Sequence, residues 1–266
     1  MAAPEICFPF FDIPPTRPKP RNLGQTIVSD WSVPLGFQRD WLGAVGGYLD
    51  KAKFSDHAGT SGGSVTANFI REKIKIYGEF DIPCSLGGIP FEIAHVTNTV
   101  EQYFERSKEL GFDGIEISFD TIPDVPDAER GRLIKLGFDM GLNVYTEVGE
   151  KFPTDRLDPQ KAIDEVKRDL DYGSAKVTVE NEEFAYYFEN DKKGATKIVE
   201  AIGLEDLIFE LGPKGWPEMP VWLVKEFSTD INVQSLTWDK IQPMEGIRRG
   251  LSRLDGYFNL TAKIPK

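Results

Sequence analysis

Acidic side chains recur in this sequence directly after short apolar stretches. Glu116, Glu147 and Glu210 each follow or interrupt a β-like run at a similar point, and Asp30 ends another run. Carboxylates that converge on one site repel each other unless a cation or a lysine joins them. Oxygen ligands suit Mg²⁺, and the chain has no cluster of His and Cys. We therefore expect Asp30, Glu116 and Glu147 to hold a magnesium ion.

Lysines and other polar residues occupy neighbouring positions. The lysines that can balance the carboxylates and bind an anionic substrate are Lys53, Lys151 and Lys214. The pair Gly87-Gly88 lets backbone N–H groups approach an anion, although a plain turn is the commoner use of two glycines. Further candidates for substrate contacts are Ser118, Glu180 and Asn232 at predicted strands, and His57 in the loop after Lys53.

Each of these residues also has an ordinary structural interpretation. A lone glutamate near a strand end is usually a solvated loop residue or a charge at a helix N-terminus. His57 and His95 lack the partners of a Ser–His or Cys–His arrangement, so the sequence disfavours nucleophilic hydrolysis. The similar position of the carboxylates in successive units is what favours a common site.

The elements that must position these residues alternate in one rhythm. Short apolar or β-branched runs are followed by longer helical patterns, which is typical of βα units. The eight predicted strands cover residues 26–30, 48–54, 82–86, 114–118, 143–148, 176–180, 207–211 and 232–236. The first strand leads into residues 31–34, which lack the glycine-rich phosphate loop of doubly wound sheets. We therefore predict an α/β protein with a single (β/α)₈ TIM-type barrel and a site at the carboxyl ends of its strands.

The N-terminus differs from the rest of the chain. Six prolines fall between residues 4 and 20, and proline fixes φ and removes a backbone donor. We predict an extended proline-rich N-terminal arm over residues 1–22 that packs outside a barrel formed by residues 23–266.

Composition narrows the classes of function. The 266 residues include 31 Lys and Arg against 43 Asp and Glu, and the net charge is −12, which disfavours nucleic acids and anionic membranes as partners. The two isolated cysteines, Cys7 and Cys84, fit a reduced protein, and no apolar run is long enough for a membrane span. The N-terminus does not resemble a signal peptide, so we expect a cytoplasmic enzyme. The sequence does not decide between a monomer and a homo-oligomer.

In their order and spacing, the strand-end residues resemble those of the phosphosulfolactate synthase family, known as ComA. The similarity runs through nearly the whole chain after residue 18. The stretches that carry it are Lys19-Pro20-Arg21, Tyr48-Leu49-Asp50, Gly87-Gly88 with Phe91-Glu92, Leu110-Gly111-Phe112, Glu116-Ile117-Ser118, Thr146-Glu147-Val148-Gly149 with Lys151, Ile208-Phe209-Glu210 with Lys214, Asn232-Val233, and Arg248-Arg249-Gly250.

The resemblance implies a magnesium-dependent carbon–sulfur lyase. The family reaction adds sulfite to the CH₂ carbon of phosphoenolpyruvate, giving phosphosulfolactate on a route to coenzyme M. Magnesium held by acidic residues such as Glu116 and Glu147 would stabilise the developing enolate. A lysine, Lys53 or Lys151, would then protonate the neighbouring carbon.

The sequence departs from the family pattern at three predicted loops. Residues 180–183 read Glu-Asn-Glu-Glu where the family has Glu-Gly-Arg-Glu, so Glu182 reverses a charge. Residues 55–58 replace a glycine-containing turn, and Ile89 replaces a threonine. These changes keep two alternatives open: a diverged enzyme that performs an addition, elimination or cyclisation on a less anionic substrate, or a non-enzymatic, stress-associated barrel protein. The retained lysines and carboxylates argue against the second.

Overall fold

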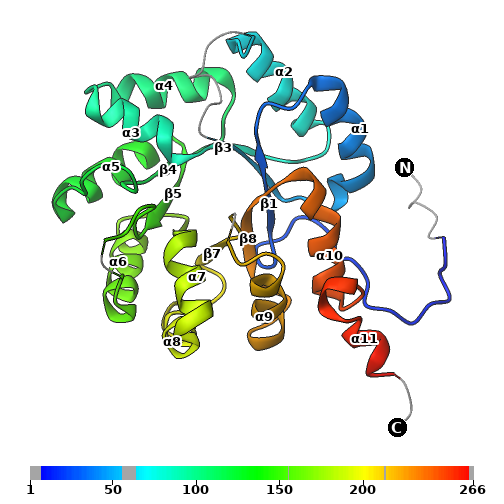
Figure 1. Cartoon of the computed structure of the whole chain (residues 1–266). Coiled ribbons are helices and arrows are strands. Elements are labelled where there is room, and N and C mark those ends of the chain that lie inside the picture. The colour runs from blue at the N-terminus through cyan, green and yellow to red at the C-terminus, as the bar shows by residue number, and fades with distance from the viewer. Residues whose placement is uncertain (1–6, 56–63, 155, 213, 264–266) are drawn as a thin grey trace.

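The chain forms a closed barrel of eight parallel strands surrounded by helices (Figure 1). The computed structural model describes residues 7–55, 64–154, 156–212 and 214–263. Each strand pairs with the next along the chain, and β8 closes the ring by pairing with β1. The predicted (β/α)₈ barrel is thus confirmed.

The strands are short and most are flanked by helices on the outside. The strands are β1 (Thr26–Asp30), β2 (Lys51–Phe54), β3 (Cys84–Leu86), β4 (Gly114–Ile117), β5 (Asn143–Val148), β6 (Lys176–Val179), β7 (Leu207–Glu210) and β8 (Asn232–Leu236). The α-helices are α1 (Leu35–Val45), α2 (Ala67–Gly78), α3 (Gly88–Val96), α4 (Val100–Leu110), α5 (Asp127–Asp139), α6 (Pro159–Asp171), α7 (Asn181–Asn190), α8 (Lys192–Ile202), α9 (Glu218–Glu226), α10 (Ile241–Arg249) and α11 (Phe258–Thr261). Three 3₁₀ turns are η1 (Gly46–Tyr48), η2 (Trp238–Lys240) and η3 (Arg253–Asp255).

Alternation along the strands separates a polar barrel interior from an apolar layer beneath the helices. Successive side chains of a strand point to opposite faces. On the outward face, Val177 and Phe209 pack in the core against helix residues. On the inward face, Gln234 of β8 donates a hydrogen bond to Thr178 of β6 across the interior, at 3.1 Å. The helices therefore bury the apolar face of the sheet, while polar side chains fill the barrel.

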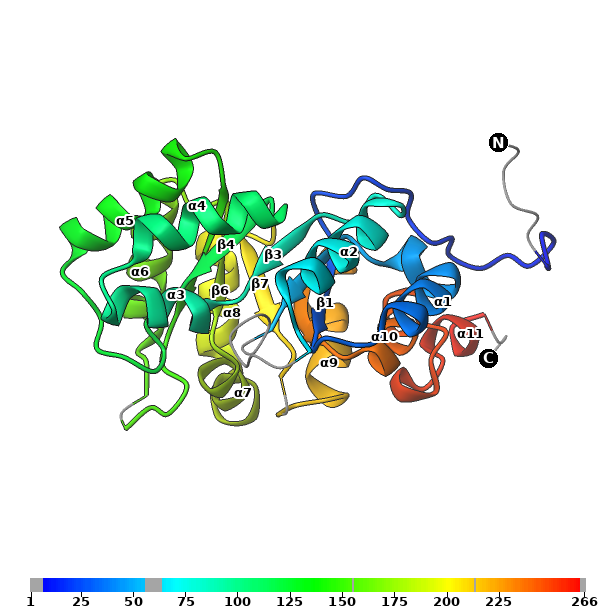
Figure 2. The same cartoon turned by 90° about the horizontal axis from the view of Figure 1, so that it is seen from above.

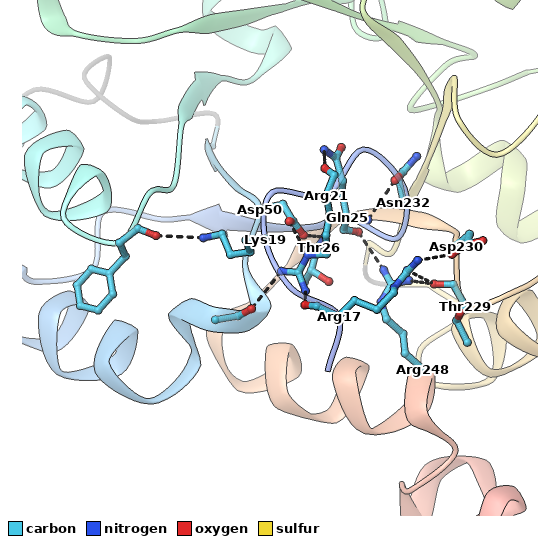
Figure 3. Close-up of polar contacts among 12 residues, drawn as sticks. Arg17, Lys19, Arg21, Gln25, Thr26, Asp50, Thr229, Asp230, Asn232 and Arg248 are labelled. Atoms are coloured by element: carbon cyan, nitrogen blue, oxygen red, sulfur yellow. Dashed lines mark hydrogen bonds and ion pairs between the residues drawn. The ribbon is translucent and has the colours of Figure 1, made fainter. Parts of the chain in front are cut away.

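Charged groups from the segment before β1 close the amino-terminal end of the barrel (Figure 3). Arg21 forms a buried ion pair with Asp50 at 2.7 Å, and Asp50 also accepts a hydrogen bond from the Thr26 backbone N–H at 2.8 Å. Arg17 pairs with Asp230, and Arg248 donates to the Ile231 carbonyl at 2.8 Å. This end of the barrel is tied down by ion pairs and hydrogen bonds.

Both described ends of the chain lie on the side of the barrel where α1 and α11 pack (Figures 1 and 2). The sequence did not predict α3, α7 or the short α11, and of these α3 and α7 begin just after a strand, at the carboxyl end of the barrel. Within the described residues, no helix combines the length and the apolar character that a membrane span requires.

Candidate active site

A cavity of about 480 Å³ opens at the carboxyl ends of the strands. The ionisable residues that line it come from four strands, from the loops after β4 and β5, and from η2. They are Lys53, Glu116, Asp120, Glu147, Lys151, Glu210 and Lys240. The structure therefore brings together five of the predicted site residues, Gly88, Lys53, Glu116, Glu147 and Lys151. It also places Glu210 there, whose position suggested a common site without a stated role, and adds Asp120 and Lys240, which the sequence did not assign to the site.

Lys53 and Glu116 form a buried ion pair in the floor of this cavity. The Lys53 Nζ lies 2.6 Å from Glu116 Oε1 and 2.8 Å from Oε2. Burial disfavours the Lys53 ammonium, but attraction by Glu116, Glu147 and Glu210 outweighs burial and raises the pKa of Lys53. Lys53 is therefore a fixed positive charge at neutral pH.

The backbone of Gly88 helps to fix the position of the Glu116 carboxylate. The Gly88 backbone N–H donates to Glu116 Oε1 at 3.0 Å. A Cβ atom at Gly88 would lie 2.0 Å from Ser118 Oγ, so only glycine allows this close approach. The Gly87 N–H is bonded to the Phe54 carbonyl at 2.9 Å. Both N–H groups are thus occupied, and the pair positions protein groups rather than presenting free donors to a substrate.

Asp120, Glu147 and Glu180 form a second group of charges. One carboxylate oxygen of each lies within 4.8 Å of the others, and all three residues are buried. Asp120 Oδ1, Glu147 Oε1 and Glu180 Oε2 have no hydrogen-bond partner among the described residues. Buried polar atoms are rarely left without a partner, so this cluster requires an explanation.

Burial and mutual repulsion shift the acidities of this cluster. Burial first, then repulsion by Asp120 and other carboxylates, raises the pKa of Glu147 well above its usual range. The pKa of Asp120 rises to about 7 because burial outweighs the attraction of Lys151. The pKa of Glu180 rises to about 9 through burial and repulsion by Glu210. The cluster therefore contains more carboxyl groups than the nearby cations can keep ionised at neutral pH.

Lys151 lies at the edge of the cluster and is partly open to solvent. Its Nζ is 3.4 Å from Asp120 Oδ2 and 3.9 Å from Glu180 Oε2. Burial lowers its pKa less than Glu180 and Asp120 raise it, so the pKa of Lys151 increases overall. For Glu210, burial raises the pKa, but attraction by Lys53 and Lys151 together with the hydrogen bond from Ser235 outweighs burial, so the pKa is lowered overall.

Three buried carboxylates fit a hard divalent cation. Mg²⁺ prefers oxygen ligands and is commonly bound through a few carboxylates, with water or substrate completing its shell. Unpartnered oxygens on Asp120, Glu147 and Glu180 meet this requirement. The group shares only Glu147 with the set predicted from the sequence, because Glu116 is engaged by Lys53.

The structure does not place Asp30 in the cavity. Ser29 lines the cavity, and alternation along β1 turns Asp30 outward, toward α2. There Asp30 is fully buried, 2.9 Å from Lys73 Nζ, and accepts a hydrogen bond from the Tyr77 hydroxyl at 2.6 Å. The prediction that Asp30 binds a metal ion together with Glu116 and Glu147 is therefore wrong, because its side chain faces Lys73 and Tyr77 instead.

Two other predicted substrate contacts also lie away from the cavity. Asn232 begins β8 at the amino-terminal end, where its amide donates to the Leu207 carbonyl at 3.0 Å. Ser118 is fully buried and donates to Glu92 at 2.7 Å, so it orders the loop after β4. The predicted contact His57 lies outside the described residues.

Lys214 is exposed and forms an ion pair with Glu182. Neither side chain lines the cavity, although α7, which carries Glu182, begins next to Glu180. The charge reversal at Glu182 therefore has a structural consequence, since it neutralises a lysine that the sequence suggested for anion binding.

A second cavity, of about 570 Å³, adjoins the first and shares Asp120 and Glu147 with it. It lies between the loops after β4 and β5. Its most buried cation, Arg130, is already bound by Asp169 through two hydrogen bonds, at 2.8 and 2.6 Å. The first cavity, which contains both catalytic lysine candidates, is therefore the better candidate for the reaction.

The comparisons with known proteins show the family of this chain. Residues 14–253 match the family model described as (2R)-phospho-3-sulfolactate synthase (ComA). Phosphosulfolactate synthase of Methanothermobacter thermautotrophicus is 31% identical over 253 residues, 91% of this chain and 94% of that protein. The enzyme of the same name from Methanocaldococcus jannaschii is 31% identical over 239 residues, 86% and 92% of the two chains.

Solved structures support the fold alone. A putative lyase/mutase from Burkholderia cenocepacia has a TM-score of 0.53 with this chain, at 16% identity. The match covers 94% of this chain and 89% of that one.

Proposed function

Because the chain belongs to the phosphosulfolactate synthase (ComA) family and is therefore a lyase, we propose that it adds sulfite to phosphoenolpyruvate or a related unsaturated acid. One observation at the site is the main support for this proposal. Three buried carboxylates with unpartnered oxygens face two protonated lysines at the carboxyl end of the barrel. This arrangement suits chemistry in which negative charge develops on a bound acid.

In this proposal, Asp120, Glu147 and Glu180 hold a magnesium ion. When bound, the ion would neutralise the repulsion among the carboxylates and supply positive charge near an enolate oxygen. The raised pKa values of Asp120 and Glu180 describe the protein without that charge. These raised values support the proposed cation, because the neighbouring side chains only partly offset the repulsion among the carboxylates.

Lys53 and Lys151 have different roles in this proposal. Lys53 is held by Glu116 and provides a fixed charge that orients an anionic group of the substrate. Lys151 is less tightly held and reaches the cavity from the loop after β5. The sulfur lone pair of sulfite forms the C–S bond at the CH₂ carbon, and the C=C electrons move toward the carboxylate. A proton from the Lys151 ammonium then closes the reaction at the adjacent carbon, and solvent reprotonates the amine.

The proposed reaction can be tested directly by ³¹P NMR. Purified protein with Mg²⁺, phosphoenolpyruvate and sulfite is expected to form a new phosphate ester, and omitting sulfite should abolish it. Lys214 lies outside the cavity and is paired with Glu182, so it offers no free positive charge to an approaching anion, and we expect a high KM for phosphoenolpyruvate. Absence of the ester at millimolar substrate, with folded protein, would reject sulfite addition to phosphoenolpyruvate.

A further inference from the structure

The cavity at the carboxyl end has two unlike sides. Its carboxylates and Lys151 come from β4, β5, β7 and the loops that follow β4 and β5. On the other side of the ring, β8, β1 and β3 lead into residues that are mostly uncharged, and the charged exceptions among the described lining residues are Lys240 and Lys53 of β2, which pairs with Glu116. We call Trp31, Ile89 and Thr237 the uncharged wall.

Trp31 is the largest side chain of the uncharged wall, and 57% of its surface is exposed. Asp30 fixes the loop that carries Trp31, because Asp30 Oδ1 accepts a hydrogen bond from the Ser32 backbone N–H at 2.7 Å. Ser32 adopts φ of 63°, a left-handed conformation that is uncommon for serine. Asp30 itself is fixed by Lys73 at 2.9 Å. A buried network thus holds the solvent-exposed indole of Trp31 at the cavity. Strained backbone positions such as that of Ser32 cluster where ligands bind.

The cavity is also larger than a three-carbon acid requires. Its volume of about 480 Å³ falls in the range of about 300–1,000 Å³ that is typical for drug-sized ligands. Such ligands are usually held by apolar contacts together with a few polar groups. Here the four carboxylates lie on one side, which leaves the uncharged wall for another part of the ligand.

The charges favour the same interpretation. Four carboxylates line the cavity against three lysines. A ligand with several negative charges and no apolar part would therefore meet more carboxylates than lysines. Resting on the proposed function, we propose that the preferred substrate is an unsaturated acid with an apolar or aromatic substituent, seated against Trp31 and Ile89 while its carboxylate faces Lys53.

Binding of two matched probes tests this inference. Pyruvate and phenylpyruvate differ only in the phenyl group, and calorimetry in the presence of Mg²⁺ gives the Kd of each. We expect phenylpyruvate to bind about ten- to a hundred-fold more tightly, as burial of one aromatic group predicts. In Trp31→Ala this preference should fall at least about fivefold, while pyruvate affinity stays unchanged.

Two further variants control for indirect effects. Phe138→Ala removes an aromatic side chain that is similarly exposed on α5, and it should leave both Kd values unchanged. Ile89→Ser alters the uncharged wall from the β3 side and should lower the preference as Trp31→Ala does. Equal binding of the two probes, or an equal loss of affinity for both in Trp31→Ala, would overturn the inference.

The result of this binding test can be distinguished from the result of the test of the proposed reaction. Selective binding of phenylpyruvate without any sulfite addition would reject the reaction and keep the apolar subsite. Rapid sulfite addition to phosphoenolpyruvate without a preference for phenylpyruvate would keep the reaction and reject the subsite.

Discussion

The two ends of the barrel treat their charges in opposite ways. At the amino-terminal end, Arg21 is paired with Asp50, and Arg248 binds backbone carbonyls, with only its Nε left without a partner. At the carboxyl end, Asp120, Glu147 and Glu180 each keep an oxygen without a hydrogen-bond partner among the described residues. One end satisfies its polar groups, whereas the other leaves them available to a ligand.

This difference separates stability from function. A buried ion pair that loses one partner leaves an uncompensated charge, so the amino-terminal pairs are expected to matter for folding. Unsatisfied carboxylates cost free energy, and a folded protein retains them where a cation or substrate binds. The same division is general in (β/α)₈ barrels, in which the carboxyl end of the strands carries the chemistry.

The largest expected effect on activity comes from Lys151. Lys151→Met removes the proposed proton donor and should lower kcat about 10²- to 10⁴-fold, the usual contribution of general acid–base catalysis. Lys151→Arg keeps the positive charge near Asp120 but is a poor acid, so it should retain the thermal stability of the wild-type protein and little of the activity. Steady-state kinetics with phosphoenolpyruvate and sulfite measure both variants. Near-normal kcat in Lys151→Met would assign proton transfer to another group.

The largest expected effect on stability lies at the opposite end. Arg21→Met leaves the buried carboxylate of Asp50 without its cation and should lower the free energy of unfolding by about 3–5 kcal/mol. Urea denaturation measures the change. The comparison variant Arg17→Met breaks a half-exposed pair with Asp230 and should cost only about 0–1 kcal/mol. Equal losses in the two variants would show that burial does not control the effect of these pairs.

A smaller effect is expected from removing one proposed metal ligand. Glu180→Gln should weaken Mg²⁺ binding about ten- to a hundred-fold, since one interaction with a full charge is lost. Glu183→Gln, in the first turn of the helix that Glu180 caps but outside the cluster, is the matched control and should bind Mg²⁺ normally. Isothermal titration with Mg²⁺ gives both affinities. Full activity of the wild-type protein after exhaustive dialysis against EDTA would exclude the metal.

The smallest expected effect concerns the ion pair between Glu182 and Lys214. Glu182→Arg frees Lys214 and adds a positive charge near α7, so KM for phosphoenolpyruvate should fall up to about tenfold. Glu189→Arg makes the same charge change at the far end of α7 and should alter KM less. A similar decrease in both variants would indicate a general effect of net charge on the approach of the anion.

The barrel and the core of the site could be predicted because both depend on repeating patterns. Eight βα units determine the fold, and Lys53, Glu116 and Glu147 occupy inward positions near the ends of their strands. Asp30 was assigned wrongly because a shift of one residue reverses the face of a strand, and the strand boundary alone does not reveal which face is inward.

Other parts of the site depend on contacts that no local pattern specifies. Helix α3 begins with Gly88 and contains Pro90 in its first turn, so its sequence resembles a loop more than a helix. Asn232 was assigned to the site by its strand, yet it lies at the strand's first residue and therefore at the other end of the barrel. The cluster of Asp120 and Glu180 forms only when the segments after β4 and β6 meet across β5, which requires these three strands to lie side by side in the sheet.

The separation of function and stability between the two ends can be tested in one experiment. Magnesium-dependent addition of sulfite to phosphoenolpyruvate is measured for the wild-type protein, Lys151→Met and Arg21→Met, with each rate divided by the folded fraction at the assay temperature. The account predicts that Lys151→Met is fully folded and nearly inactive, and that Arg21→Met is less stable but has the wild-type rate per folded molecule. A wild-type rate in Lys151→Met, or a loss of rate in folded Arg21→Met that matches the loss in Lys151→Met, would contradict it.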